Sequence, residues 1–475
     1  MLITLAQLAG SELEWTNRTT IHPIGLAMTA VCGLALLALP RKMAVWPFIV
    51  MACMVAPAQR LVVGGLDFNL IRLLVLFGAV RVALRTEYAT VRWTAVDAVI
   101  LAFAAVRTLA YTIQYADTSA LINQAGQSFD AVGLYFLFRC LIRDKADVIR
   151  TVIGFAIMSI PVMIAFALEK QSGRNVFSVF GGVPATTAVR EGRLRCQGAF
   201  SHPIIAGCFW AAMMPLFGAL WWQGAVNRIW AIVGTVCAGM IVVFTASSTP
   251  VMGVLFGMMG GAMFFVRWWM KWIVMGACML GMFLHFSMQA PIWHLISRIT
   301  IAKGNTGYHR FQLIDNAVSR FGEWALVGTK STAHWFWGGQ DVTNQYILEG
   351  VRGGFLTLAL FVATIWICFR YVGRSWRAAG RDRPTVILSW ALGVALWVHC
   401  TNFIAVSYFG QGTFIWYLHL AMIVSMWEFI RRTAAARAVV AGRAPAPRRT
   451  ERPPIWALMT PPAPNARATA EGRSP

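Results

Sequence analysis

Residues 193–220 read RLRCQGAFSHPIIAGCFWAAMMPLFGAL. From Pro203 to Leu220 no side chain is charged, and an apolar helix of about 20 residues is long enough to cross a bilayer. The residues before Pro203 form a polar loop that carries two arginines. This junction of a polar loop and an apolar run recurs along the chain and predicts an all-α polytopic membrane protein.

Similar apolar runs predict about 12–13 transmembrane helices. They begin near His22, Met43, Phe68, Thr94, Gly126, Thr151, Ser201, Ile229, Thr249, Trp272, Tyr346, Thr385 and Thr413. Of the 475 residues, 58% are hydrophobic and only 13% are charged. A soluble globular protein of this size is not expected to be so apolar.

The positions of Lys and Arg predict the orientation, because basic residues in short loops are retained on the cytoplasmic side. The basic clusters fall on one side when the helices are threaded: Arg41-Lys42, Arg85 to Arg92, Arg143 to Arg150, Arg228, Arg267 to Lys271, Arg370 to Arg383 and the tail from Arg431. The amino terminus is then outside and the carboxyl terminus is cytoplasmic. We attribute the net charge of +22 to topology and to contact with membrane lipids, and expect no nucleic-acid partner.

Three parts of the chain follow from this pattern. Residues 1–21 are predicted to form an outer amino-terminal segment, 22–430 the transmembrane domain, and 431–475 a basic, disordered cytoplasmic tail rich in Arg, Ala and Pro. Two outer loops, at about 169–200 and about 290–345, are large enough to hold a site. Both carry more basic than acidic residues although they face outward.

Arginines in these loops are the leading candidates for chemistry. A guanidinium binds phosphate oxygens through a planar fork and keeps its charge, so Arg193, Arg195 and Arg310 suit a phosphate whose attached chain lies in the membrane. The alternative is that they contact lipid headgroups or pair with Glu191, Asp315 and Glu323.

Histidines provide the second group of candidates. His202, His309 and His334 are predicted to lie on the outer side, where each could act as a general base or orient one, or serve a structural role. His399 and His419 fall within spans, where hydrogen bonds between helices are expected.

Other features of the chain have structural interpretations. The residues Asp67, Arg72, Asp97, Arg107, Asp130 and Arg139 lie near or inside spans and predict pairing at helix ends or a polar interior. Phe311, Ile314, Val318 and Phe321 recur at helical spacing and predict an interfacial helix between Arg310 and Gly328. The nine cysteines form no CxxC pair, so neither a metal site nor a disulfide framework is expected.

These residues resemble the O-antigen polymerase and ligase superfamily of bacterial surface-polysaccharide enzymes, most clearly from about Asp130 to Tyr346. Three pieces carry the resemblance. They are Phe129-Asp130 through Tyr135-Phe136 and Arg139 to Arg143-Asp144; Arg195-x-x-Gly198-x-Phe200-x-His202-Pro203; and Arg310 followed by Leu326-Val327-Gly328 and Asn344-x-Tyr346 through Gly353-Gly354. One departure is Thr343, where the family usually has a histidine that is thought to assist catalysis.

The resemblance implies a GT-C-like fold in the bacterial inner membrane, with periplasmic loops and no cofactor. It implies an inverting, metal-independent glycosyltransferase whose donor is an oligosaccharide on undecaprenyl pyrophosphate. Arg195 and Arg310 would neutralise the leaving group, with Arg193 in support, and His202 would orient the first loop. Asn344 and Tyr346 would bind sugar, and His334 is a candidate base in place of the missing histidine.

Several functions remain open at this stage. A polymerase of exopolysaccharide, capsule or O-antigen is favoured over a ligase that transfers to lipid A core, partly because of Thr343. A transporter or flippase of lipid-linked glycans, or a silent scaffold in an envelope complex, would also carry arginines and apolar helices. A chain-length regulator and export machinery are possible partners of the polymerase.

Overall fold

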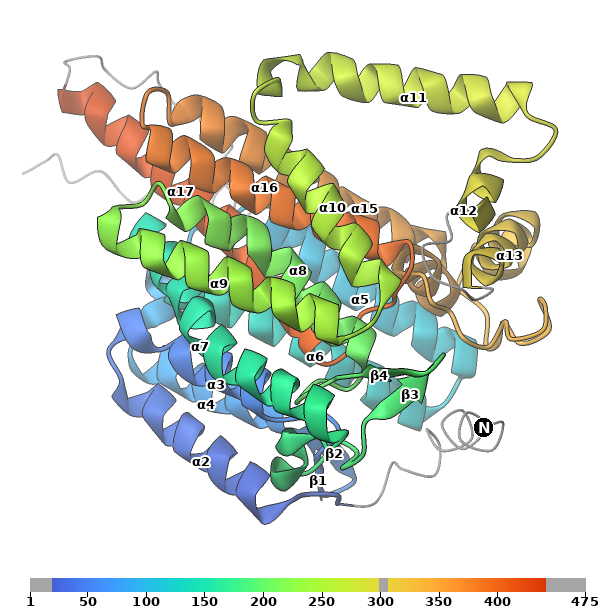
Figure 1. Ribbon diagram of the computed structural model, residues 1–475, viewed down its shortest axis with the longest axis horizontal. Coiled ribbons are helices and arrows are strands. Elements are labelled where there is room, and N and C mark those ends of the chain that lie inside the picture. Colours follow the sequence, from blue (N-terminus) through green and yellow to red (C-terminus); the bar gives the residue numbers. More distant parts are fainter. Residues whose placement is uncertain (1–18, 299–305, 441–475) are drawn as a thin grey trace, which may run out of the picture. The chain divides into compact units, whose positions relative to one another are not determined.

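The computed structural model describes residues 19–298 and 306–440, and the regular structure in these ranges is almost entirely helical (Figure 1). The α-helices are α2 (Pro23–Ala38), α3 (Trp46–Met54), α4 (Leu70–Leu84), α5 (Ala95–Tyr115), α6 (Thr118–Leu141), α7 (Lys145–Ser172), α8 (Pro203–Leu220), α9 (Ala225–Phe244), α10 (Ser248–Ala262), α11 (Met270–Ser287), α12 (Leu295–Arg298), α13 (Thr306–Ser319), α14 (Phe321–Trp324), α15 (Gln345–Ala378), α16 (Arg383–Phe403) and α17 (Gln411–Val440). Short 3-10 helices are η1 (Arg41–Met43), η2 (Glu87–Thr90), η3 (Val176–Phe180), η4 (Arg267–Trp269) and η5 (Ile292–His294). Two antiparallel hairpins complete the fold: β1 (Arg60–Val63) with β2 (Leu66–Asn69), and β3 (Ala188–Arg190) with β4 (Arg193–Arg195).

The helical polytopic class is confirmed, but the number of full-length spans is lower than predicted. Among the described residues, eight helices are long and apolar enough to cross a membrane: α5, α7, α8, α9, η4 with α11, α15, α16 and α17. The other predicted runs correspond to α2, α3, α4, α6 and α10. Most of these are short; α3 has only nine residues, which span about 14 Å at 1.5 Å per residue. The 24-residue α6 is long enough but polar, with Asn123, Gln124, Gln127 and Asp130 inside it.

The helices run between two opposite ends of the bundle, and contacts between connecting segments identify these ends. At the first, which we call the loop end, the His22 amide donates to Gln59 Oε1 at 3.0 Å, and the Cys196 amide donates to the Phe244 carbonyl at 3.2 Å. The segments 173–202 and 306–344 lie at this end, on the right of Figure 1. At the second, the basic end, Arg41 pairs with Asp147 at 2.5 Å and Lys145 Nζ donates to Thr385 Oγ1 at 3.0 Å.

Charged side chains near the helix ends are paired, as the sequence predicted. Arg72 pairs with Asp130 at 2.7 Å at the loop end, and Arg139 pairs with Asp97 at 3.3 Å at the basic end. Arg139 is 3% exposed and also lies 3.8 Å from Glu428. Removing one partner from such a pair would leave a buried charge unpaired, at a cost of about 3–5 kcal/mol.

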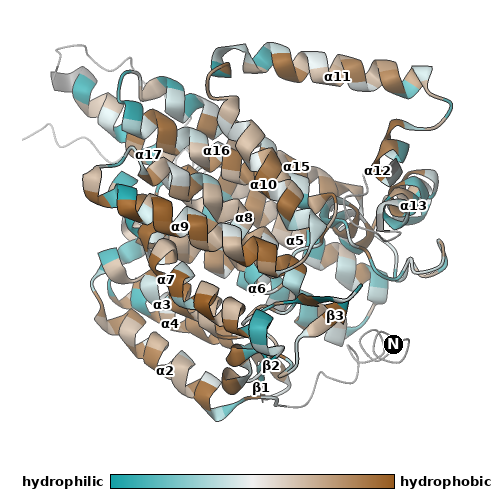
Figure 2. Cartoon of the chain, viewed as in Figure 1, coloured by the Kyte–Doolittle hydropathy of each residue, from teal (hydrophilic) through white to brown (hydrophobic). Residues whose placement is uncertain are grey.

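Figure 2 shows that hydrophobic residues cover most of the helix surfaces and that many of the hydrophilic ones lie near the helix ends. One buried cluster joins α2 to α10 with α15, α16 and α17. A small second cluster lies at the loop end, where Leu313 and Ala317 of α13 pack with Trp324, Trp335 and Val351. Of the predicted stripe, Val318 of α13 is 52% exposed and Phe321, which belongs to α14, is 45% exposed, so α13 packs on the protein through Leu313 and Ala317 rather than through Val318.

Two glycines, one at the bend of α15 and one in the segment after α14, allow these two parts of the chain to approach closely. Gly354 lies inside α15 with φ 77°. A Cβ added at this residue would lie 2.2 Å from the Leu326 carbonyl oxygen. Gly328, with φ 90°, would place a Cβ 2.3 Å from the Val351 carbonyl oxygen. The close approach is completed when the Phe355 amide donates to the Ala325 carbonyl at 2.8 Å.

We predict that Gly354→Ala lowers the free energy of unfolding by at least about 2 kcal/mol, because a side chain at positive φ is strained and its Cβ overlaps backbone. Melting of the detergent-solubilised protein, followed by fluorescence-detected size exclusion, measures the effect. Gly276→Ala in α11 is the control, since its Cβ would enter open space. Equal melting temperatures for the two variants would contradict the prediction.

Candidate anion-binding site

The turn between α9 and α10 brings the two leading arginines of the sequence together. Arg195 Nη2 donates to Ser247 Oγ at 2.7 Å, and Arg310 Nη2 donates to Thr249 Oγ1 at 3.0 Å. Ser247 is the N-cap residue of α10, and two residues span at most about 7 Å of chain. Side chains from segments more than 100 positions apart in the sequence therefore meet at the amino end of one helix.

Arg195 reaches this turn because hydrogen bonds to the end of α7 hold its loop in place. Glu169, at the end of α7, is fully buried and accepts hydrogen bonds from the amides of Gln197 at 3.1 Å and Gly198 at 3.0 Å. Asn175 Nδ2 also donates to the Gly198 carbonyl at 2.8 Å. These bonds satisfy a buried carboxylate and hold the residues that follow Arg195 in one conformation.

Arg310 is carried by α13, the helix predicted to lie over the bundle. Leu313, one turn further along, is fully buried, and Ala317 is 4% exposed. Their packing on Trp335 and Val351 fixes the side of α13 that faces the loop end. The guanidinium then extends to Thr249 at the start of α10.

Neither guanidinium makes an ion pair with any residue that the structure describes. The Nε atom of Arg195 is buried and has no hydrogen-bond partner in the described ranges. Burial lowers the pKa of Arg195, and the nearby charge of Arg190 lowers it further. Burial also lowers the pKa of Arg310. Arginine nevertheless stays protonated, so two charges with only hydroxyl partners face one helix terminus.

The amino end of α10 adds to this positive potential. A helix N-terminus has amides without intrahelical partners and carries a partial positive charge of about half a unit. Ser247 makes no capping hydrogen bond to these amides. Two guanidiniums beside such a terminus form a site for a multiply charged anion, and a diphosphate supplies both the charge and the number of acceptor oxygens.

His202 lies beside this site as the N-cap residue of α8. Its Nδ1 accepts from the Ile204 amide at 3.2 Å, so a neutral ring carries its proton on Nε2. Burial, followed by the charges of Arg195 and Arg190, lowers the pKa of His202 to about 4. The ring is thus neutral near pH 7 and suited to donate a hydrogen bond, and its Nδ1 caps the start of α8.

The structure gives the predicted sugar-binding residues structural contacts. Asn344 caps α15 by accepting from the Ile347 amide at 3.1 Å, and its Nδ2 donates to the Ile404 carbonyl at 3.1 Å. The Tyr346 hydroxyl donates to the Cys400 carbonyl at 3.1 Å. These bonds attach the start of α15 to the end of α16, and no contact joins either side chain to the two arginines.

The candidate base His334 also makes its contacts with residues other than Arg195 and Arg310. Its Nε2 lies 2.8 Å from Glu323 Oε1, and its side chain is 51% exposed. Arg320 and Trp335 share the same carboxylate at 3.9 Å and 3.3 Å. Arg193 is exposed and makes no side-chain hydrogen bond or ion pair with the described residues.

A chain of polar groups connects α16 and α17 with α15 and α5, and sequence reasoning identified its histidines and Arg107. His399 Nε2 and His419 Nδ1 are 2.8 Å apart, as expected for a bond between spans, and His399 Nδ1 is 3.0 Å from the Tyr408 hydroxyl. The chain continues through Gln345, which accepts from the Tyr408 amide at 2.6 Å and donates to Glu349 at 2.6 Å. Glu349 lies 3.5 Å from Arg107. Ser247 and Thr249 were also missed, because a hydroxyl in an apolar run carries no distinctive pattern.

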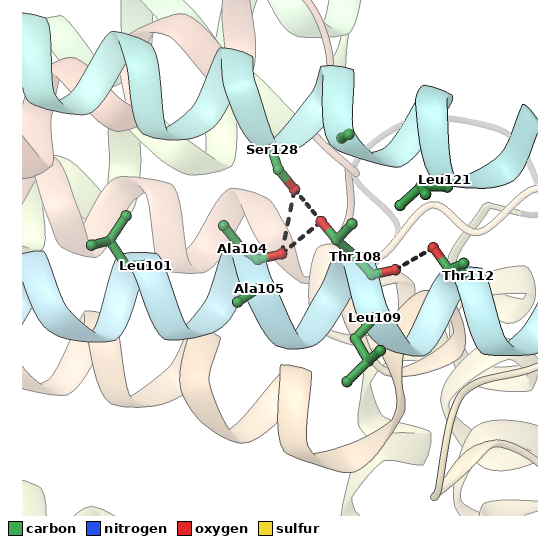
Figure 3. A pocket seen from close by; sticks show the side chains of 9 residues that line it. Leu101, Ala104, Ala105, Thr108, Leu109, Thr112, Leu121 and Ser128 are labelled. Atoms are coloured by element: carbon green, nitrogen blue, oxygen red, sulfur yellow. Dashed lines mark hydrogen bonds between the residues drawn. The ribbon is translucent and has the colours of Figure 1, made fainter. Parts of the chain in front are cut away.

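An open groove of about 630 Å³ lies between α5 and α6. Figure 3 shows Leu101, Leu109 and Leu121 beside Thr108 and Ser128, whose hydroxyls are 2.7 Å apart. The Thr108 and Thr112 hydroxyls donate to carbonyls one turn earlier, each at 2.8 Å. The groove therefore offers no unpaired hydroxyl and suits a hydrocarbon chain.

Comparisons with known proteins give no family. No protein-family model matches the chain, and no curated protein matches it. Among the described residues there is also no group of three or more His, Cys, Asp or Glu side chains that could hold a metal ion. The functional argument accordingly rests on the geometry around α10.

We predict that His202 makes the fold sensitive to acid. The folded protein takes up this proton only near pH 4, whereas an unfolded chain takes it up near 6.5, so unfolding binds a proton between these values. Lowering the pH through that window reduces the free energy of unfolding, by at most about 3 kcal/mol from this residue.

Thermal melting of purified protein between pH 7 and pH 4 measures the effect, and His202→Asn, which keeps a capping oxygen, should lose less stability over this range. His22→Asn is the matched control, because His22 caps α2 in the same way and is also followed by proline. An unchanged pH dependence in His202→Asn would show that the imidazole is not responsible.

Proposed function

We propose that the protein is an inverting, metal-independent glycosyltransferase of cell-envelope polysaccharide synthesis. Its donor would be an oligosaccharide on undecaprenyl pyrophosphate and its acceptor the hydroxyl of another lipid-linked repeat unit. One observation carries the proposal: the guanidiniums of Arg195 and Arg310, without acidic partners in the described ranges, meet at the amino end of α10.

The chemistry asks the protein mainly for positive charge and positioning. The acceptor oxygen attacks the anomeric carbon and gives up its proton to solvent, the bond from that carbon to the phosphate oxygen breaks, and the diphosphate leaves with the electron pair. Negative charge therefore increases on the diphosphate in the transition state. Preorganised donors in a site of low dielectric constant stabilise such charge better than water does, and removing one typically costs about 10²–10³ in rate.

The apolar surroundings fit a lipid carrier. The arginines lie at the end of a bundle whose outer surfaces are hydrophobic, so a diphosphate can reach them while its chain stays in the membrane. The groove between α5 and α6 has the lining such a chain requires. The resemblance to O-antigen polymerases and ligases, carried by Arg195 and Arg310, supports the same reaction.

Within this chemistry we favour a polymerase, with the ligase as the alternative. The two share donor and bond type, and Thr343 replaces the histidine that the ligases are thought to use. A transporter of lipid-linked glycans is less favoured, because the buried charges Arg107 and Arg139 are each paired with a carboxylate in the bundle. A chain-length regulator and an export assembly would be the partners of a polymerase.

We further propose that the loop end faces the periplasm of a bacterial inner membrane. The basic end collects Arg41, Lys42, Arg85, Arg143, Arg228, Arg267 and Arg377 around the connections between helices. Short basic loops stay in the cytoplasm, which directs the loop end outward.

Cysteine labelling tests this orientation. Cys278 is exposed and the other eight cysteines are buried, so Cys278→Ser provides the background. Ala188→Cys at the loop end should react with an impermeant maleimide in spheroplasts, and Ala378→Cys at the basic end only after permeabilisation. Both positions are exposed, so the opposite pattern would reverse the assignment.

The transferase itself is tested by the size of lipid-linked and surface glycan in a deletion strain. Wild-type protein should restore long polymer, whereas Arg310→Lys should leave single repeat units, because an ammonium cannot make the two-pronged contact with phosphate. We expect at least a hundredfold loss of polymer, in line with the loss of one positioned donor of about 10²–10³. Arg195→Lys should behave in the same way.

Arg320→Lys is the matched control, since Arg320 is exposed and lies on the same segment as Arg310 but pairs with Glu323. Long polymer that remains on its lipid carrier in the deletion strain would indicate a ligase. Unchanged glycan in the deletion strain would exclude both enzymes.

A further inference from the structure

The β3–β4 hairpin gathers three arginines on one face. In its register Arg190 lies directly opposite Arg193, and Ala188 lies opposite Arg195. Residues directly opposite each other in an antiparallel pair share a face, and so do residues two positions apart on one strand. Arg190, Arg193 and Arg195 therefore point to the same side of the hairpin.

The turn of the hairpin makes this arrangement rigid. Only Glu191 and Gly192 connect the strands, with φ 53° and 72°. Positive φ at both positions is typical of a type I′ turn, whose twist matches that of the two strands. The register, and with it the common face of the arginines, is fixed by this short connection.

The orientation of the hairpin follows from its two faces. Leu194, on the face without arginines, lies against Gly173 at the end of α7, and its carbonyl accepts from Lys170 Nζ at 3.0 Å. On the other face Arg195 binds Ser247. The arginine face is thus directed toward the amino end of α10, and Arg193 leaves its strand about 7 Å from Arg195.

The outer two arginines lack adequate counter-charge. Arg190 and Arg193 are exposed like charges placed directly opposite, which is a destabilising arrangement. The neighbouring carboxylate, Glu191, lies 3.8 Å from Arg190 and both side chains are nearly half exposed, so their attraction is weak. Arg193 has no such partner in the described ranges. An anion bound between these side chains would remove the repulsion.

We propose that the arginine face of β3–β4 binds acidic groups of the glycan, so that the repeat unit handled by this protein carries carboxylate, phosphate or sulfate. This inference rests on the proposed function for the identity of the ligand as a glycan. The face continues outward from the site that would hold the diphosphate, which is the direction in which sugars attached to that diphosphate extend. Residues 188–193 are all exposed, and three of the six, Arg190, Glu191 and Arg193, are charged, as expected for a surface that contacts a hydrated chain.

Direct binding tests the proposal with full-length protein in nanodiscs of zwitterionic lipid. The probe is a short oligogalacturonate, which has a carboxylate on each sugar, and a neutral maltooligosaccharide of equal length is the comparison. Wild-type protein should bind the acidic oligosaccharide, with an affinity that falls as salt is raised, and should not bind the neutral one.

The double variant Arg190→Gln/Arg193→Gln should bind the acidic probe at least about tenfold more weakly, because it removes two of the three guanidiniums that can each make a charge-assisted contact with the probe's carboxylates. Arg174→Gln is the matched control, an exposed arginine in the same loop outside the hairpin. Its affinity should equal that of wild type. Since the double variant removes a like-charge pair, its melting temperature should be no lower than that of wild type, which shows that the hairpin is intact.

Equal binding by the double variant and wild type overturns the proposal. So does an effect of the double variant that appears only when the nanodiscs contain phosphatidylglycerol, because the face would then bind lipid headgroups. The result is separable from the proposed function. Loss of polymer in Arg310→Lys together with unaltered glycan binding in the double variant rejects only the acidic-glycan surface, and the converse rejects only the transferase.

Discussion

The amino end of α10 holds two guanidinium groups that have partly left water without gaining a carboxylate. Bringing a charge into an apolar environment costs several kcal/mol unless it is paired. Within residues 19–298 and 306–440, the hydrogen-bond partners of Arg195 and Arg310 are the hydroxyls of Ser247 and Thr249. Both large loops and the start of α8 lie around this turn. The conformations of the loops bring these two charges to the same helix terminus.

The other buried arginines show how this protein treats a charge that is purely structural. Arg81 is 1% exposed, and both prongs of its fork meet Glu87, at 3.1 Å and 2.9 Å. The carbonyls of Leu36 and Leu39 take its remaining nitrogen. Providing an acceptor for every nitrogen of a guanidinium is thus possible in this fold. Its absence at Arg195 and Arg310 distinguishes a ligand site from a structural ion pair.

The helical class and the positions of the helices could be predicted because apolar runs and basic loops are strong, local patterns. Each predicted run corresponds to a helix of the structure. The lengths of the helices could not be predicted, since hydropathy does not reveal where α3 ends or that the polar residues of α6 pair with neighbouring helices. Arg195, Arg310 and His202 could be identified by type and position. The hydroxyls of Ser247 and Thr249 could not, because their role comes from a turn whose neighbours are distant in sequence.

Several residues of the predicted site proved to be explained by the fold. Asn344 and Tyr346 stand in a motif of the resembling family, yet their hydrogen bonds attach α15 to the end of α16. His334 has a carboxylate partner of its own in Glu323. A sequence motif records that a residue type is needed at a position, and a helix cap can need an asparagine as much as a sugar can.

The bend at Gly354 has a mechanical consequence for the site. The part of α15 before the bend packs on α13 through Val351, and α13 carries Arg310, whereas Arg195 is attached to α7 through Glu169. The two charges are therefore attached to different helices. A displacement of the part of α15 before Gly354 relative to α7 would change the spacing between the guanidiniums, and with it the size of the anion that fits between them.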